Sequence, residues 1–341
     1  MIELRGISKT FNPGTVNENQ VLKDLNLTLN EGDFITVIGG NGAGKSTLLN
    51  IISGSIEADS GLILLNDVDV SKLKEHKRAP YFGHVFQDPM RGTAPDMTVL
   101  ENIALAYGRG RSRSLFRWSI RKKDKDYYYE QVKSLDLGLE KRMHQKVGLL
   151  SGGQRQALTL LMATMNQKPS HRKIIKEYGM FYMGDKDAAK KEVKAVYSEA
   201  RKQFVDELKS IIKDKSLNKQ EKKTKIKESY NVFDSKIRKY DLTNPVLLLD
   251  EHTAALDPKT AEKVLSITDK IVKERHLTTI MITHNMKDAI KYGNRLIMMS
   301  KGKIVVDVSS EDKKKLTIED LLEKFTSASH DMLSDSAILG D

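Results

Sequence analysis

The sequence predicts an α/β fold that is organised around a phosphate-binding loop. An apolar run at residues 34–38 leads directly into a segment with four glycines at residues 39–44. Apolar residues at helical spacing follow, at positions 48, 49, 51 and 52. Two more strand-like runs, at residues 246–250 and 279–283, lead into acidic or histidine side chains. Strand, glycine-rich loop and helix in this order are typical of proteins that bind nucleoside triphosphates.

Each residue type in this loop suits a phosphate group. The glycines let successive backbone N–H groups converge on the β- and γ-phosphates at the start of a helix. A lysine adds positive charge beside those phosphates, and the serine hydroxyl is a ligand for Mg²⁺. The candidate nucleotide-binding residues of the loop are Gly39, Asn41, Gly42, Gly44, Lys45, Ser46 and Thr47. The sequence therefore predicts a site for a nucleoside triphosphate, with Ser46 as a metal ligand.

Three further candidates follow predicted strands. Asp250 ends the run at residues 246–250, where a carboxylate helps to hold the Mg²⁺ that bridges the phosphates. Glu251 is the next residue and would project differently, so we expect it to be catalytic and to polarise the attacking water. Gln87 follows the strand-like run at residues 81–86, and its amide is a candidate ligand of the metal or of the water.

Six motifs occur in a consistent order along the chain. They are residues 39–47, Gln87, Leu-Ser-Gly-Gly-Gln at residues 150–154, residues 246–251, Ala-Leu-Asp at residues 255–257, and His284. In this order they resemble the P-loop, Q-loop, signature, Walker B strand, D-loop and H-loop of the ATP-binding subunit of an ABC transporter. The resemblance covers residues 1–169 and 246 to about 325. It implies a P-loop NTPase of ABC type, with a RecA-like core, an antiparallel β subdomain and a helical signature subdomain at about residues 88–165.

The resemblance also implies a dimer. In this family the signature contacts the γ-phosphate of ATP that is held by the opposite subunit. The candidates for that contact are Ser151, Gly152, Gly153 and Gln154, at the predicted N-terminus of a helix that is itself a second anion site. A homodimer would then hold two composite sites, and a monomer would be a poor ATPase.

Three more roles follow from the same resemblance. His284 would contact the γ-phosphate and the loop at Asp257 across the dimer interface, so it is a second catalytic candidate. Phe11 would stack on the adenine, although an ordinary core or surface role remains open. His252 stands where the family usually has proline. It either titrates near the catalytic carboxylate or leaves the chemistry untouched.

Residues 170–245 are an insertion relative to the family. Joining residue 169 to residue 246 would restore the usual spacing. The segment carries a net charge of +8 of the chain's +11. Apolar residues recur at helical steps over residues 193–211 and 226–240, with Leu217 and Asn218 between them, and predict an antiparallel helical hairpin with arms of about 20–25 residues. A self-packed elaboration, docking to a partner protein, and binding to anionic lipid or nucleic acid all remain open.

The chain as a whole reads as a motor subunit. It has no cysteine and no apolar run near the roughly 20 residues that span a bilayer, which suits a peripheral protein on the cytoplasmic face of the membrane. We expect ATP-driven import of a small solute such as an amino acid, most similar to putative tryptophan/tyrosine-type importers. The expected partners are a transmembrane permease, a second ATPase subunit and a substrate-binding protein, with no specific nucleic acid. The alternative is a soluble ABC ATPase that acts on nucleic acid or ribosomes. A helical run near residues 316–325 is expected before a loosely ordered tail at residues 326–341.

Overall fold

The structure is a computed structural model of the chain. It describes residues 1–108, 120, 122–165, 174, 178, 185–214, 216–238, 240 and 246–329. The chain divides into two units by its internal contacts. The first comprises Met1–Ile63, Ser71–Gln167 and Asn244–Asp341, and the second comprises Leu64–Val70 and Lys168–Thr243. The sequence did not assign residues 64–70 to the same unit as the inserted segment.

A mostly parallel sheet forms the core of the first unit. In the described part of the chain its strand order is β10-β9-β3-β8-β7-β6. The strands are β3 (Phe34–Ile38), β6 (Phe82–Val85), β7 (Val246–Asp250), β8 (Thr279–Ile282), β9 (Arg295–Ser300) and β10 (Lys303–Val308). Only the β9–β10 pair is antiparallel among the pairs of this sheet. Because parallel strands place their carboxyl ends on one edge, the loops after β3, β7 and β8 meet there.

Helices cover this sheet, and their ends follow local sequence signals. They are α1 (Lys45–Ser53), α9 (Pro258–Arg275) and α10 (Met286–Lys291). α1 buries Leu48, Leu49, Ile51 and Ile52, the four residues whose spacing predicted it. β3 and β7 are buried over nearly their whole length, as expected for strands covered on both faces. The predicted strand, loop and helix order is therefore confirmed.

A second sheet has the strand order β2-β1-β4-β5 in the described residues, and its β1–β2 and β4–β5 pairs are antiparallel. Its strands are β1 (Ile2–Phe11), β2 (Asn19–Leu29), β4 (Ser60–Leu65) and β5 (Val68–Asp69). A short helix, α2 (Glu75–Arg78), follows. The Arg78 guanidinium is buried and donates to the carbonyls of Ile51 and Ile52 at 2.6 and 3.0 Å. It therefore satisfies carbonyls at the C-terminal end of α1.

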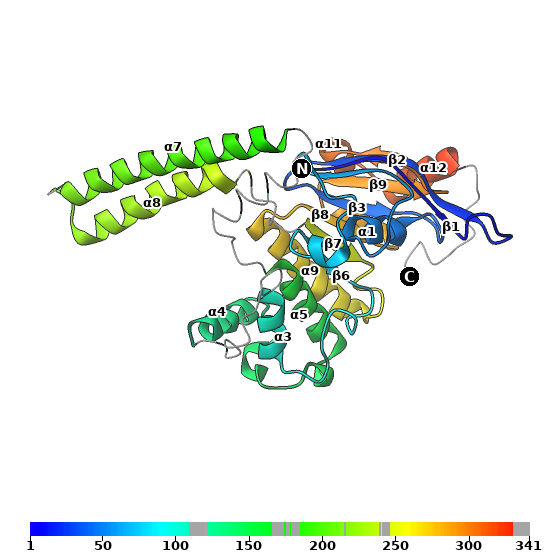
Figure 1. Cartoon of the computed structure of the whole chain (residues 1–341). Coiled ribbons are helices and arrows are strands. Elements are labelled where there is room, and N and C mark those ends of the chain that lie inside the picture. Colours follow the sequence, from blue (N-terminus) through cyan, green and yellow to red (C-terminus); the bar gives the residue numbers. More distant parts are fainter. Residues whose placement is uncertain are drawn as a thin grey trace. The chain divides into compact units, whose positions relative to one another are not determined.

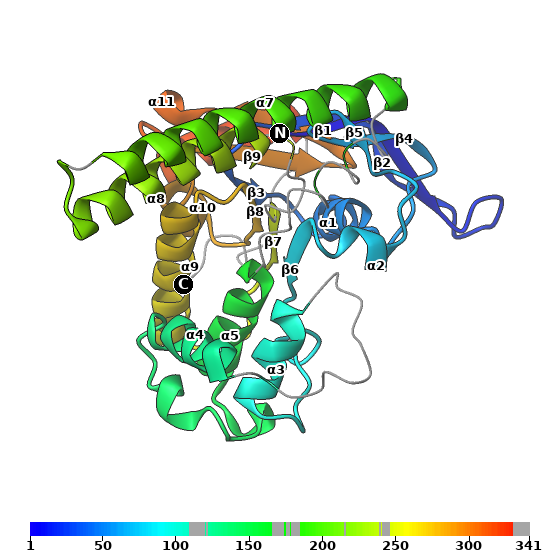
Figure 2. The ribbon, with the colours of Figure 1, turned by 60° about the vertical axis from the view of Figure 1, so that its left-hand side comes forward.

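The signature helix lies in a helical group within the first unit. The members are α3 (Val99–Tyr107), α4 (Lys122–Lys133), the 3₁₀ turns η1 (Leu139–Arg142) and η2 (Val147–Leu149), and α5 (Gly152–Thr164). α3, α4 and α5 contact one another, as both views show (Figures 1 and 2). Apolar residues of this group share one core with residues of β6, β7 and α9, including Val85, Leu249 and Leu265. The fold is the P-loop NTPase fold of ABC type that the motifs predicted.

The second unit contains the helical hairpin. It consists of α7 (Lys186–Lys213) and α8 (Lys219–Arg238), which lie side by side in both views (Figures 1 and 2). At 28 residues α7 is longer than the predicted arm, whereas α8 has 20 residues. The turn falls at Leu217 and Asn218 as predicted, where the Asn218 side chain caps α8 by accepting from the amides of Gln220 and Glu221.

The hairpin core is narrower than the periodicity suggested. Val193, Ala200, Phe233 and Ile237 are buried. Tyr230, predicted on the apolar face, is 45% exposed. Its ring edge still contacts Phe204, because two helices alone cover only a narrow stripe of each other.

Two short helices follow the main sheet. They are α11 (Ser310–Lys313) and α12 (Ile318–Ser329). Leu321 of α12 is fully buried in a cluster with Ile38 and Leu296, as the helical spacing predicted. α12 extends past residue 325, and residues 330–341 of the expected tail lie outside the described residues. Among the described residues, no helix is both long and apolar enough to cross a membrane.

Candidate nucleotide-binding site

The loop after β3 has a backbone that only glycine accommodates at two positions. Gly39 has a φ of 151°, and a Cβ atom there would lie 2.2 Å from the carbonyl oxygen of Met299. Gly44 has a φ of 97°, and its Cβ would lie 2.8 Å from the carbonyl oxygen of Val21. Neighbouring backbone therefore approaches the loop closely at both positions, so a side chain there would displace the loop at the start of α1.

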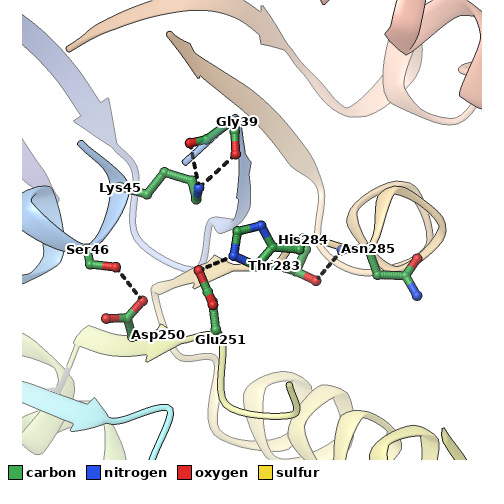
Figure 3. A network of polar contacts seen from close by, with 9 residues as sticks. Gly39, Lys45, Ser46, Asp250, Glu251, Thr283, His284 and Asn285 are labelled. Carbon is green, nitrogen blue, oxygen red and sulfur yellow. Dashed lines mark hydrogen bonds and ion pairs between the residues drawn. The ribbon is translucent and has the colours of Figure 1, made fainter. Parts of the chain in front are cut away.

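The Lys45 side chain folds back onto the loop. It donates to the carbonyl oxygens of Gly39 at 2.7 Å and Gly40 at 3.1 Å (Figure 3). Lys45 is only 6% exposed, and burial lowers its pKa, whereas the nearby carboxylates of Glu251 and Asp250 act in the opposite direction. A cation held at the centre of a glycine loop is placed to neutralise phosphate oxygens.

Two oxygen groups meet where the loop approaches β7. The Ser46 hydroxyl donates to Oδ1 of Asp250 at 3.0 Å (Figure 3). Burial raises the pKa of Asp250 although this hydrogen bond lowers it, so a neighbouring cation would stabilise the ionised carboxylate. In the described part of the chain, no three His, Cys, Asp or Glu side chains gather into a closed metal cage. One hydroxyl with one carboxylate fits Mg²⁺, which typically completes its shell with phosphate and water.

Glu251 and His284 form the second pair of the site. Nε2 of His284 lies 2.5 Å from Oε1 of Glu251 (Figure 3). This hydrogen bond is the main cause that lowers the pKa of Glu251, so the carboxyl is held in its ionised form. The backbone of Glu251 is left-handed, with a φ of 46°. Its N–H bonds to the carbonyl of Ile282 at 3.2 Å, which secures this unusual turn.

The left-handed turn directs two adjacent acids to different partners, Asp250 to Ser46 and Glu251 to His284. An extended chain would send Asp250 and Glu251 to opposite faces of the sheet. The turn at Glu251 instead directs its carboxylate toward His284 at the same edge. Non-glycine residues in this conformation are uncommon and are often found at functional sites.

The signature turn, which we define as residues 151–154, is organised separately. Ser151 caps α5 by accepting from the Gln154 amide at 3.3 Å, and the Gln154 side chain accepts from the Ser151 amide at 3.3 Å. The side-chain Nε2 of Gln154 also donates to the carbonyl of Leu137 at 3.2 Å. Ser151 and Gly152 are exposed, whereas Gly153 is buried against Thr260 of α9. The turn is thus a helix N-terminus with its outer face open to solvent.

The other predicted residues lie outside the network drawn in Figure 3. Asp257 caps α9 by accepting from the Thr260 amide at 3.1 Å. Gln87 is exposed in the bend after β6, and Phe11 is the last residue of β1, half-buried, with the Lys9 ammonium 5.7 Å from its ring centroid. Asn41 is exposed and Thr47 is half-buried.

His252 directly follows Glu251 in the sequence but belongs to the core. It is 2% exposed, and Nε2 lies 3.2 Å from the Thr268 hydroxyl on α9. Burial lowers its pKa to about 4, so the ring is neutral near pH 7. The interpretation of His252 as a group that titrates beside the catalytic carboxylate is therefore not supported.

A cavity that the sequence did not predict lies beside β6. Its volume is about 360 Å³, and its lining includes Phe82, Phe86, Leu105 and Met162. His84 also lines it; in the described structure neither of its ring nitrogens has a hydrogen-bond partner, and burial lowers its pKa to about 4. Gln87 directly follows this lining in sequence. A histidine in a strand-like run carries no sequence signal that distinguishes a core residue from a cavity wall.

Comparisons with known proteins identify the family. A family model described as ABC transporter matches residues 22–170. The tyrosine transport ATP-binding protein of Clostridioides difficile (strain R20291) is 36% identical over 326 residues, which cover 95% of this chain and 98% of the relative. The chain belongs to the ATP-binding proteins of ABC transporters. It is therefore an ATPase of this family, in which ATP hydrolysis drives transport.

More distant relatives agree with this family. The phosphonates import ATP-binding protein PhnC of Lactococcus lactis (strain IL1403) is 26% identical and covers 95% of this chain and 99% of its own length. A dimeric ATP-binding cassette in a post-hydrolysis state, bound to ADP and Pi, matches the fold with a TM-score of 0.57 at 22% identity, over 91% of this chain and 99% of that one. The ABC fold thus covers most of the chain.

Proposed function

We propose that this chain hydrolyses ATP with Glu251 as the catalytic base and works as the motor subunit of an importer for a small solute. The observation that carries the proposal is the convergence of Lys45, Ser46, Asp250, Glu251 and His284 at one edge of the sheet (Figure 3). We call these five residues the phosphate-site cluster. Their chemistry divides into binding of phosphate, binding of metal and activation of water.

The binding steps use Lys45, Ser46 and Asp250. The Lys45 ammonium exchanges its two loop carbonyls for phosphate oxygens, and the loop N–H groups hold the same phosphates. Ser46 and Asp250 would hold Mg²⁺, and the charge of that ion would stabilise negative charge on the phosphates. The other predicted nucleotide residues are Phe11, Gly39, Asn41, Gly42, Gly44, Thr47 and Gln87, of which Phe11 stacks on the adenine and Gln87 contacts the metal or the water.

The hydrolytic step uses Glu251 and His284. The ionised Glu251 carboxylate accepts a proton from the water that attacks the γ-phosphate. His284 holds that carboxylate in place through the 2.5 Å contact, and its ring is a candidate donor to the γ-phosphate. Because the contact lowers the pKa of Glu251, the base stays ionised over the whole neutral range.

The signature turn supplies the remaining phosphate contacts from a second copy of the chain. Its own hydrogen bonds are local caps, and its outer face is exposed. A helix N-terminus with exposed N–H groups favours an anion. Ser151, Gly152, Gly153 and Gln154 of each copy then contact the ATP of the other, with Asp257 at the same interface. The solved cassette of the same fold is a dimer, which supports this arrangement.

The membrane partner is a permease that docks at the cavity beside β6. The cavity is lined mainly by aromatic and aliphatic side chains, with Ser53, Glu75, His84 and Thr159 as its polar residues. Gln87 directly follows Phe86 of the cavity wall and is the proposed ligand of the metal or the water. Docking of the permease at the cavity would therefore be coupled to the nucleotide site through Gln87. The chain would lie on the cytoplasmic face of the membrane and draw solute from a substrate-binding protein. Its similarity to a tyrosine transport protein favours an aromatic amino acid as the solute.

The dimer model is tested by the concentration dependence of ATP hydrolysis. We expect the rate per mole of purified chain to rise with protein concentration, because two chains complete each site. Gel filtration with ATP and without hydrolysis should show the dimer. A rate per mole that stays constant down to concentrations where only monomer is present would contradict the composite site.

The permease is tested by purification from membranes in mild detergent. We expect a multi-span protein to co-purify in stoichiometric amount. A Phe86→Asp variant, which places a charge in the cavity wall, should lose the permease and keep ATP binding. Recovery of the wild type only from the soluble fraction, without a membrane partner, would contradict the transport role and leave the ATPase chemistry in place.

A further inference from the structure

The hairpin of the second unit has an uneven charge distribution. Residues 209–227, which we call the hairpin tip, contain eight lysines and two acidic residues, a net charge of +6. Residues 185–208 contain six basic and six acidic residues, and residues 228–238 contain two of each. These two stretches, the hairpin base, are neutral. More than half of the chain's net charge of +11 therefore lies in 19 consecutive residues.

Contacts between the helices show that these 19 residues form one end of the hairpin. Tyr240 donates to Glu192 at 3.0 Å, Lys236 donates to Gln203 at 2.6 Å, and Lys222 donates to the carbonyl of Ile212 at 2.9 Å. As the residue number falls from 240 to 236 to 222, the number of its partner rises from 192 to 203 to 212. The two helices are therefore antiparallel. The tip consequently gathers the last turn of α7, the connecting turn and the first two turns of α8.

The tip presents its lysines to solvent. The exposed ones among the described residues are Lys209, Lys213, Lys219, Lys223, Lys225 and Lys227. Ile212 stands among them with 58% of its surface exposed. Cations around an exposed aliphatic side chain are the composition that binds an anionic membrane surface, because the lysines meet headgroups and the apolar group enters the interface.

Three features favour lipid over nucleic acid. Residues 205–229 contain no aromatic side chain, so the tip has no group on which bases stack. Its basic residues are all lysine, without the arginine that reads phosphate and base edges in bidentate fashion. An exposed isoleucine has no use on a phosphate backbone, whereas it contributes to binding at a lipid interface.

We propose that the hairpin tip binds anionic phospholipid headgroups through its lysines, with Ile212 inserted between them. The tip would then be a membrane contact that is separate from the permease and from the nucleotide site. The attraction is long-ranged electrostatics rather than a fixed pocket, so it should weaken steeply as salt rises. This proposal does not depend on the identity of the transported solute or on ATP hydrolysis.

The test is co-sedimentation of the full-length chain with vesicles. One set contains phosphatidylcholine alone and the other contains phosphatidylcholine with phosphatidylglycerol. We expect binding to the anionic vesicles, loss of binding at high salt, and little binding to the neutral vesicles. Equal binding to both vesicle types would overturn the proposal.

A matched pair of variants assigns the binding to the tip. The tip variant carries Lys219→Gln, Lys223→Gln, Lys225→Gln and Lys227→Gln. The base variant carries Lys190→Gln, Lys191→Gln, Lys194→Gln and Lys202→Gln, which remove the same charge from exposed positions of α7. Lysine and glutamine have similar helix propensities, so both variants should keep the helical content of the wild type.

The two variants differ in their distance from the tip. Lys190 and Lys209 are separated by about 28 Å along α7, which is several times the Debye length of about 8 Å at physiological salt. Each lysine close to an anionic surface contributes about a fivefold factor in affinity, so we expect the tip variant, which lacks four lysines, to lose about six hundredfold. The base variant should lose less than about threefold, since its lysines are beyond the screening distance.

Two further measurements complete the test. Ile212→Ser should lower the affinity for anionic vesicles about fivefold at low salt, because it removes the apolar contribution and leaves the charge of the tip unchanged. Basal ATP hydrolysis should be the same in all variants, because none of these residues lies in the phosphate-site cluster. Equal losses in the tip and base variants would overturn the proposal. So would duplex RNA or DNA that binds the wild type more tightly than the anionic vesicles do and is lost in the tip variant.

Discussion

The phosphate-site cluster and the signature turn lie in the same unit but differ in how their side chains are bonded. The cluster joins groups from three loops that are far apart in sequence, with Ser46 bonded to Asp250 and His284 bonded to Glu251. Among the described residues, the side chains of the signature turn bond within the turn and to the carbonyl of Leu137. One copy of the chain therefore brings together the groups that we propose for phosphate, metal and base, whereas the exposed turn is proposed to contact the ATP of a second copy.

The largest effect is expected where the cluster binds phosphate. Lys45→Ala removes the ammonium at the centre of the loop, and we expect ATP affinity to fall about a hundredfold. Lys77→Ala, which changes an exposed lysine on α2, should leave affinity unchanged. Titration with a fluorescent ATP analogue on the monomer measures both. If the two variants bind equally well, Lys45 does not contact the phosphates.

The second effect separates hydrolysis from binding within the cluster. Glu251→Gln keeps the shape of the side chain but cannot accept a proton, so we expect turnover to fall about a hundredfold or more. ATP affinity should stay within about threefold, and an ATP-bound dimer should accumulate on gel filtration. Glu262→Gln, an exposed change on α9, is the control. Undiminished turnover in Glu251→Gln would remove this residue from the role of base.

The sequence predicted the cluster better than its surroundings, and the reason is geometric. Glycines, a lysine and two carboxylates at fixed spacing have few uses other than phosphate and metal binding, so order along the chain identified Lys45 and Asp250. The same spacing predicted the strands and helices that carry them. Their relation to the signature turn came from resemblance, because no local pattern shows which exposed helix N-terminus faces a partner.

Features that depend on tertiary surroundings were not predictable. Lys313 lies in a run of lysines that would be assigned to the surface, yet it is 3% exposed and donates to the Thr36 hydroxyl at 3.1 Å. The left-handed backbone of Glu251 depends on its bond to Ile282 on a different strand. In the sequence His84 cannot be distinguished from other residues of a strand, and only the fold shows that it lines a cavity. Sequence periodicity predicts single helices and strands. Burial, backbone strain and the lining of a cavity depend on how two or more of these elements pack together.

A third prediction distinguishes the glycine of the signature turn that packs against α9 from the glycine that is proposed to contact ATP. A Cβ at position 153 would lie 2.2 Å from Cγ2 of Thr260, so Gly153→Ala should lower the free energy of unfolding by about 1–3 kcal/mol. A Cβ at position 152 would lie 3.1 Å from Cδ2 of Leu256, a side-chain end that can move. Gly152→Ala should therefore change stability by less than about 1 kcal/mol and lower hydrolysis in the dimer. Urea unfolding and ATP turnover distinguish the two.

The opposite pattern would revise the comparison. If Gly152→Ala leaves turnover intact while Gly153→Ala abolishes it without loss of stability, the inner glycine is the phosphate contact. The turn would then face its own core rather than a partner.

The smallest predicted effect is the pH dependence of stability that arises from His252, next to the phosphate-site cluster in sequence but outside it. Its folded pKa of about 4 is below the ordinary value of 6.5, so the folded chain resists protonation of this ring. Above pH 6.5 neither state takes up the proton, and the stabilisation by the neutral ring is fully present. As pH falls below 6.5 the unfolded chain binds the proton first, and the free energy of unfolding falls by about 2 kcal/mol at pH 5. His84 has the same direction of shift and adds a similar loss, so the wild type should lose stability steeply over this range.

A variant at His252 separates its contribution from that of His84. His252→Gln should remove about 2 kcal/mol of the pH dependence between pH 7 and pH 5 and leave the contribution of His84 in place. Urea unfolding at several pH values measures the difference. The pH profile of ATP turnover should be unchanged in His252→Gln, because this ring bonds to Thr268 and not to Glu251. A shifted pH profile of turnover would instead show that His252 belongs to the phosphate-site cluster. Histidine in place of the usual proline of the family would then affect catalysis rather than packing.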